Sequence, residues 1–260
     1  MSDLLQRGDT GVSPTSSMRT PAARAMTECL RLRATAPRRS TVAWLLGLSP
    51  LPRDARPWYR SALGELHVAA QLRALGDAWT VLTADDADAG RLIIGPAGAF
   101  IVDTRDHAGQ RVQVSETQLL VNGRRTNHLA NARHQSAAAS RILRSGVGGP
   151  IDVTPVIALV DPGSLSFMGR RPTDVLVTAS SQLVRLLTRR KRSADAPADA
   201  LVATAQRAGW HPETEVADER TLERFAVLRH AVDTARWRRF GWVAGAALLI
   251  VAACWLGLGV

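Results

Sequence analysis

The spacing of apolar and polar residues predicts a folded middle built from both helices and strands. Between Trp58 and Leu75 apolar residues recur every three to four positions, which is typical of an amphipathic helix. Short runs rich in Val, Ile and Leu, separated by turn residues, predict strands at 79–82, 92–94, 99–103, 112–114, 119–121 and 175–178. The almost wholly apolar run 153–160 predicts a central strand that is buried on both faces. Further helices are expected over 128–143, 181–190, 198–208 and 222–240.

The last twenty residues, Gly241 to Val260, contain no charged side chain and predict a transmembrane helix. As a helix they would extend roughly 30 Å, the thickness of a bilayer's hydrocarbon core. Three arginines within residues 236–239 precede the run, and by the positive-inside rule they place the large amino-terminal part in the cytoplasm. We therefore expect a single-pass protein of the cell membrane. Gly241 and Gly245 form a pattern that favours helix pairing and a homo-oligomer; a buried core helix is the alternative to a membrane span.

Charge is distributed unevenly along the chain, whose formal net charge is +10. Residues 1–60 carry ten basic and four acidic side chains, whereas residues 61–160 carry nine of each. The amino-terminal part is rich in Ser, Thr, Pro, Ala and Arg, so residues 1–53 are expected to form a basic, disordered arm with a helical turn or two around Ala22–Leu32. Such an arm would bind the anionic leaflet or nucleic acid, or else remain a solvated tail without a partner. The expected organisation is this arm, an α/β domain over 54–208, a juxtamembrane helical segment over 209–240 and the transmembrane helix 241–260.

The sequence lacks the motifs of several common kinds of functional site. The two cysteines, Cys29 and Cys254, exclude a disulfide framework and indicate a reducing compartment. The six histidines show no metal-ligand spacing, no Gly-Lys pair is present to form a P-loop, and no G-x-S-x-G motif occurs. Common metal-histidine, nucleotide-binding and serine-hydrolase sites are therefore not indicated.

Four stretches resemble one family of proteins. They are the Leu-Gly-Glu triplet ending at Glu65, the hairpin sequence from Arg91 to Gln110, the segment 121–125, and a helix that carries Arg133 and Gln135. Together they resemble the NERD (nuclease-related domain) family, which is similar to the PD-(D/E)xK nucleases. The resemblance implies a restriction-endonuclease-like mixed sheet flanked by helices, and a metal-dependent phosphodiesterase site.

The resemblance also implies the residues of that site. Glu65 takes the place of the helix acid, Asp103 that of the second-strand acid, and Gln135 that of the helix glutamine. Asp103 and Glu65 would share a Mg²⁺ ion, the cofactor that the family implies. The family's strand aspartate is replaced by Gly90, and its lysine is replaced by Arg105.

These replacements favour loss of efficient hydrolysis. Arg105 keeps a positive charge that can bind phosphate, but it cannot act as a general base. The expected function is a degenerate nuclease-like module that binds nucleic acid or a partner at the cytoplasmic membrane face. The alternative is an active metal-dependent nuclease in which Arg105 replaces the lysine and an acid from 85–88 replaces the aspartate. A scaffold unrelated to nucleic acid is a third possibility.

Each candidate residue also has a structural explanation. Glu65 would be a solvated helix residue or pair with an arginine, Asp103 would pair with Arg105 on the same face of a strand, and Gln135 would be an ordinary polar helix residue. A basic run is a candidate contact for nucleic acid or the membrane, or else a solvated linker: Arg189, Arg190, Lys191 and Arg192.

Overall fold

The computed structural model describes residues 20–37, 39–84, 89–190, 197–213 and 217–257, with side chains of the last helix described as far as residue 248. Its helices are α1 (Pro21–Thr35), α2 (Thr41–Leu45), α3 (Ala55–Leu72), η2 (Arg73–Leu75), α4 (His128–Val147), η4 (Ser180–Gln182), α5 (Leu183–Thr188), α6 (Ala198–Arg207) and α7 (Glu219–Gly257). Its strands are β1 (Thr80–Ala84), β2 (Arg91–Gly95), β3 (Gly98–Asp106), β4 (Arg111–Val114), β5 (Leu119–Val121), β6 (Arg124–Thr126), β7 (Val153–Val160), β8 (Ser164–Phe167), β9 (Leu176–Ala179) and β10 (Trp210–Pro212). The chain is therefore an α/β protein.

Two mixed sheets organise the strands. The larger has the order β10-β1-β2-β3-β7-β9, and the smaller has the order β6-β5-β4-β8. In the larger sheet β1, β2, β3 and β10 pair antiparallel, whereas β7 lies parallel to both β3 and β9. The expected central strand 153–160 is confirmed as β7, and every residue of it except Thr154 is buried.

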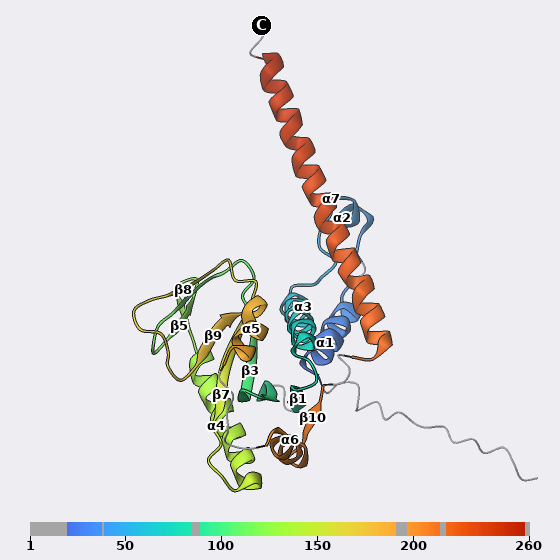
Figure 1. The fold of residues 1–260 in the computed structure, drawn as a ribbon. Helices are drawn as coiled ribbons and strands as arrows, with labels where there is room; N and C mark the ends of the chain where they lie inside the picture. The colour runs from blue at the N-terminus through green and yellow to red at the C-terminus, as the bar shows by residue number, and fades with distance from the viewer. Residues whose placement is uncertain (1–19, 38, 85–88, 191–196, 214–216, 258–260) are drawn as a thin grey trace, which may run out of the picture.

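Helices cover both faces of the larger sheet, which explains why its strands read as continuous apolar runs (Figure 1). On one face α3 and α5 pack on Ile93, Phe100 and Val156. On the other face α4 and α6 pack on neighbours such as Leu92 and Ile101. These two hydrophobic clusters therefore lie on opposite faces of the larger sheet.

The expectation of a disordered arm is wrong for residues 21–35, which form α1. Thr20 caps this helix by accepting a hydrogen bond from the backbone N–H of Ala23, at 3.1 Å, and Pro21 occupies the first turn. Its small apolar face, which includes Met26 and Cys29, is buried against α3 and α7. The buried residues Ala22, Ala25, Met26 and Cys29 follow the helical spacing i, i+3, i+4 and i+7, but most of them are small, so the sequence indicated only a helical turn or two. Residues 1–19 lie outside the described part of the chain.

The expected domain boundary at residue 208 is also wrong, because the chain beyond it returns to the larger sheet. Residues Trp210–Pro212 form the edge strand β10 beside β1. The backbone N–H of Glu213 then donates to the carbonyl of Val81, at 2.9 Å. The strands β6, β8 and β10 were not predicted, because their sequences RRT, SLSF and WHP lack the run of Val, Ile and Leu that marks the other short strands.

The long helix α7 leaves the rest of the molecule and extends away from it (Figure 1). Its first turns belong to the core, since Phe225 and Leu228 pack against α1 and α3. Within the part of the chain that the structure describes, no helix contains a stretch long and apolar enough to cross a membrane. The predicted span 241–260 lies partly outside the described side chains.

Candidate functional site

A cavity of about 290 Å³ opens where α1, α3, α4 and the β2–β3 pair meet. It brings together four residues that the sequence singled out, namely Glu65, Asp103, Arg105 and Gln135. The complete lining is Pro21, Arg24, Ala25, Trp58, Ser61, Glu65, Gly90, Arg91, Val102, Asp103, Thr104, Arg105 and Gln135. The contribution of α1 was not expected from the sequence, because this helix was assigned to a disordered arm.

The most buried charge at this cavity is the guanidinium group of Arg91, whose side chain is 1% exposed. Its Nη1 donates to the carboxylate of Glu65 on α3. Its Nε and Nη2 donate to the two carboxylate oxygens of Glu213, at 2.7 and 3.1 Å. Arg91, the first residue of β2, therefore bridges α3 on one side and the segment after β10 on the other. Sequence reasoning missed Glu213 entirely.

Burial and ion pairing shift the pKa values of this cluster in opposite directions. Burial raises the pKa of Glu65, and the neighbouring guanidinium of Arg91 only partly offsets that effect. For Arg91 burial alone would lower the pKa, but the two carboxylates outweigh it and raise the pKa above its usual value. Arg91 thus stays charged, and it compensates carboxylates that would otherwise be buried without a cation.

Asp103 and Arg105 form the second ion pair of the cavity. They lie two residues apart on β3, so their side chains share one face of the strand. The Nε of Arg105 donates to Oδ2 of Asp103 at 2.8 Å. The Asp103 side chain is nearly buried, whereas that of Arg105 is 31% exposed. The pairing that the sequence offered as the structural explanation for these residues is present.

The carboxylates at this cavity do not make a good site for Mg²⁺, which prefers near-octahedral oxygen coordination. Arg91 opposes Val102 in the β2–β3 ladder, so Gly90 comes level with Asp103 but supplies no ligand. Gly90 has a φ of +72°, and a Cβ there would lie 2.9 Å from the carbonyl oxygen of Val102. The acids at 85–88 lie outside the described residues. Among the residues that are described, no group of three or more His, Cys, Asp or Glu side chains is placed to hold a metal ion.

A pair of histidines beyond the end of β3 also escaped the sequence reasoning, since 21 residues separate them. The Nε2 atoms of His107 and His128 are 3.1 Å apart, and Nδ1 of His107 is 2.9 Å from Oε1 of Gln110. With the amide oxygen of Gln110 as acceptor, His107 carries its proton on Nδ1 and accepts through Nε2. His128 is then the donor between the two rings.

We expect this histidine pair to make stability depend on pH. Burial, followed by the charge of Arg105 and the proximity of His107, lowers the pKa of His128 from 6.5 to about 4. The unfolded chain therefore binds more protons between these two values, so stability falls as the pH drops through that window. Because His128 is partly exposed, solvent screening reduces the effect, and we expect the free energy of unfolding to fall by about 1 kcal/mol between pH 7 and pH 5. Urea unfolding of the full chain in detergent at pH 7 and pH 5 measures it.

The matched control for this titration is His134→Asn, because His134 is an exposed residue of the same helix. His128→Asn should reduce the loss of stability on acidification, and His134→Asn should leave it unchanged. Equal pH dependence in the wild type and in both variants would contradict the assignment.

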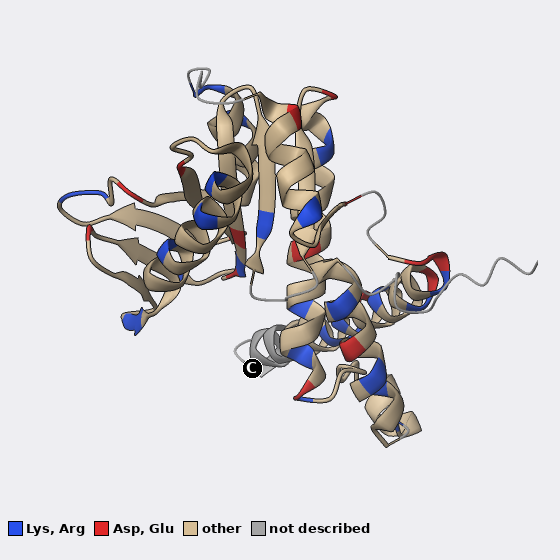
Figure 2. Ribbon diagram, turned by 90° about the horizontal axis from the view of Figure 1, so that it is seen from below, with Lys and Arg blue, Asp and Glu red and all other residues tan. Residues whose placement is uncertain are grey.

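The basic run at the end of α5 does not join the cavity. Arg189 and Arg190 are exposed and are not among the lining residues. Lys191 and Arg192 lie outside the described residues. Figure 2 shows that basic and acidic positions are interspersed along the ribbon rather than gathered on one element.

Comparisons with protein-family models, with curated proteins and with solved structures each find no match to this chain.

Proposed function

We propose that this chain is a membrane-anchored, nuclease-related module that binds the phosphodiester backbone of nucleic acid without hydrolysing it. The observation that carries the proposal is the guanidinium group of Arg91 between Glu65 and Glu213. In the family that the sequence resembles, the helix acid at the position of Glu65 would help to hold a divalent ion. Here the acids have a cation supplied by the chain itself.

A guanidinium group cannot replace the chemistry of a metal ion. A divalent cation polarises a phosphoryl oxygen and lowers the pKa of a bound water, whereas an arginine offers one positive charge and only hydrogen-bond donors. Arg105 cannot take a proton from water either. Asp103 already accepts a hydrogen bond from Arg105. These features support binding over hydrolysis.

The cavity keeps the means to bind an anion. Arg24 and Arg105 both line it, from α1 and β3 respectively. The bond to Asp103 uses one of the five N–H donors of Arg105, and the planar guanidinium group matches the geometry of a phosphate. A phosphate group of the backbone is therefore the ligand that we assign to this opening.

The test combines cleavage and binding on the full chain in detergent. We expect no cleavage of plasmid or single-stranded DNA with Mg²⁺ or Mn²⁺ above the level of the Asp103→Ala variant. We expect salt-dependent binding of a labelled oligonucleotide, weakened by Arg105→Gln, with a salt slope reduced by about 0.7–0.9. Arg73→Gln, which changes an exposed arginine away from the cavity, is the matched control.

Two results would contradict this proposal in different ways. Cleavage that disappears in Asp103→Ala would make the chain an active metal-dependent nuclease, with Arg105 in place of the lysine. Absence of binding at low salt by a folded chain would contradict nucleic acid as the ligand and favour a scaffold role.

We further propose that residues 241–260 anchor the chain in the cell membrane, with the α/β domain on the cytoplasmic side. The uncharged run and the arginines before it support this placement. So does the exposure of its described apolar residues: Trp242, Val243 and Leu248 are 54%, 63% and 70% exposed. The glycines at 241 and 245 would allow two such helices to pair closely.

A further inference from the structure

The short helix α2 and the turn after it contact one segment of α7, residues 238–242. A Cβ added to Gly47 would lie 2.5 Å from the backbone nitrogen of Arg239, so only glycine permits this approach. The indole N–H of Trp242 donates to the carbonyl of Leu45 at 2.8 Å. The guanidinium group of Arg238 lies 3.7 Å from the centre of the Trp44 ring. Figure 1 shows α2 beside α7 at the point where α7 leaves the rest of the molecule.

This segment contains the start of the uncharged run. Leu45 contacts Trp242, and the run begins one residue earlier, at Gly241. A bilayer that holds residues 241–260 would therefore have its boundary beside α2. Trp242 would lie at the depth where aromatic rings with a polar N–H are favoured.

The surface of this segment is apolar although it is exposed. Five residues within 42–48 are between 46% and 65% exposed: Val42, Trp44, Leu45, Leu46 and Leu48. We call them the apolar collar. On α7 itself, Trp237 is 75% exposed and Phe240 is 51% exposed. Contiguous exposed apolar side chains of this kind mark an interaction site.

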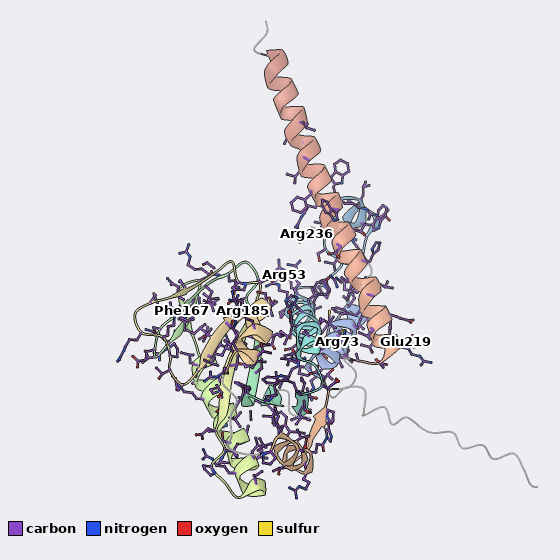
Figure 3. The ribbon with its side chains drawn as sticks, viewed as in Figure 1. Arg53, Arg73, Phe167, Arg185, Glu219 and Arg236 are labelled. Atoms are coloured by element: carbon purple, nitrogen blue, oxygen red, sulfur yellow. The ribbon has the colours of Figure 1, made fainter. Side chains whose placement is uncertain are left out.

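Arginines surround the collar, and acids are absent near it in the sequence. Residues 33–53 and 234–248 contain no Asp or Glu. Nη2 of Arg39 donates to the carbonyl of Ala43 at 2.7 Å. Burial and the charges of Arg238 and Arg33 lower the pKa of Arg39, which reflects how closely these cations gather. Figure 3 shows Arg236 on α7 at the same end of the molecule.

We propose that the apolar collar inserts into the headgroup boundary of the anionic leaflet that holds the anchor. The apolar side chains would enter the acyl boundary while the arginines pair with anionic headgroups, which is how amphipathic segments bind at an interface. This inference rests on the proposed anchor. It adds a second attachment point, which fixes the rotation of the α/β domain about α7 and hence the direction that the cavity faces.

The test places a fluorophore on the collar of the full chain in vesicles that contain anionic lipid. A nitrobenzoxadiazole label is attached to Leu45→Cys, or in a second variant to Val42→Cys, with Cys254→Ala in the background. The native Cys29 is fully buried, and its burial raises the pKa of the thiol to about 11, so it should not react. Quenching by lipids that carry a nitroxide near the headgroup reports insertion.

The matched control carries the label at Ser145→Cys. This exposed residue is at the end of α4, where Gly146 approaches Thr204 of α6. In Figure 1 α6 lies at the opposite end of the molecule from α2. We expect strong quenching at positions 42 and 45, little at position 145, and greater quenching at the collar in anionic than in neutral vesicles.

Each negative result of this experiment leads to a different conclusion. Equal and weak quenching at all three positions, in chains that stay with the vesicles through alkaline carbonate, would overturn the collar proposal alone. Protection of the collar label from aqueous iodide without lipid quenching would also overturn it, and would indicate a protein partner or a second copy. Release of the wild-type chain from the vesicles by carbonate would overturn the anchor and, with it, this inference.

Discussion

Replacing Arg91 with methionine is expected to lower the free energy of unfolding by about 3–5 kcal/mol. Methionine fills much of the same volume but leaves Glu65 and Glu213 facing each other without a cation in a buried site. The destabilisation should be smaller at pH 5 than at pH 7. Burial raises the pKa of Glu65, so the folded variant takes up a proton that the unfolded chain holds less tightly. Urea unfolding of the full chain in detergent measures both effects.

Arg133→Met is the matched control for this variant. Arg133 pairs with Asp174 at 2.6 Å, but both side chains are substantially exposed, so the change should cost less than about 1 kcal/mol. Adding Glu65→Gln and Glu213→Gln to Arg91→Met should recover part of the lost stability, because the buried charges then disappear together. An Arg91→Met effect no larger than that of Arg133→Met would contradict the role of Arg91 as the cation of this cluster.

Deleting residues 241–260 is expected to move the protein from the membrane pellet to the soluble fraction. Twenty uncharged residues would otherwise be buried in lipid, at a gain of about 25 cal/mol per Å² of apolar surface. The measurement is sedimentation of expressed protein before and after treatment with alkaline carbonate. The collar by itself should give only weak, salt-sensitive attachment, since a short interfacial segment binds reversibly.

A second variant tests whether the apolar character of residues 241–260, rather than their number, holds the chain in the membrane. Leu248→Arg with Val251→Arg keeps all twenty residues but places two charges near the middle of the predicted span, so it should also be released. Carbonate-resistant sedimentation of the deletion variant would contradict residues 241–260 as the anchor, and would assign membrane attachment to the rest of the chain.

Periodicity predicted the larger sheet well, because strands buried on both faces leave long apolar runs. The run 153–160 matches β7, and the predicted strands at 92–94 and 99–103 lie within β2 and β3. It indicated only a helical turn or two around residues 22–32, where α1 extends over Pro21–Thr35. It failed for β10, whose three residues include no Val, Ile or Leu.

The site was predictable only as far as local motifs extend. The sequence indicated that Glu65, Asp103, Arg105 and Gln135 belong together, and all four line one cavity. It also offered an arginine partner for Glu65 but could not say which. Glu213 lies 122 residues from Arg91, and no local signal connects two such positions. The pairing of His107 with His128 is unpredictable for the same reason, because tertiary packing brings them together.

Because α7 is continuous, the α/β domain and its proposed anchor would move as one rigid unit. The helix runs unbroken from Glu219 to Gly257, and its first turns are buried among α1 and α3. A helix that meets a bilayer thinner than its apolar length tilts. Because no joint separates the two ends of α7, such a tilt would swing the whole α/β domain over the membrane surface. Bilayer thickness would then set how far the cavity stands from the lipid headgroups.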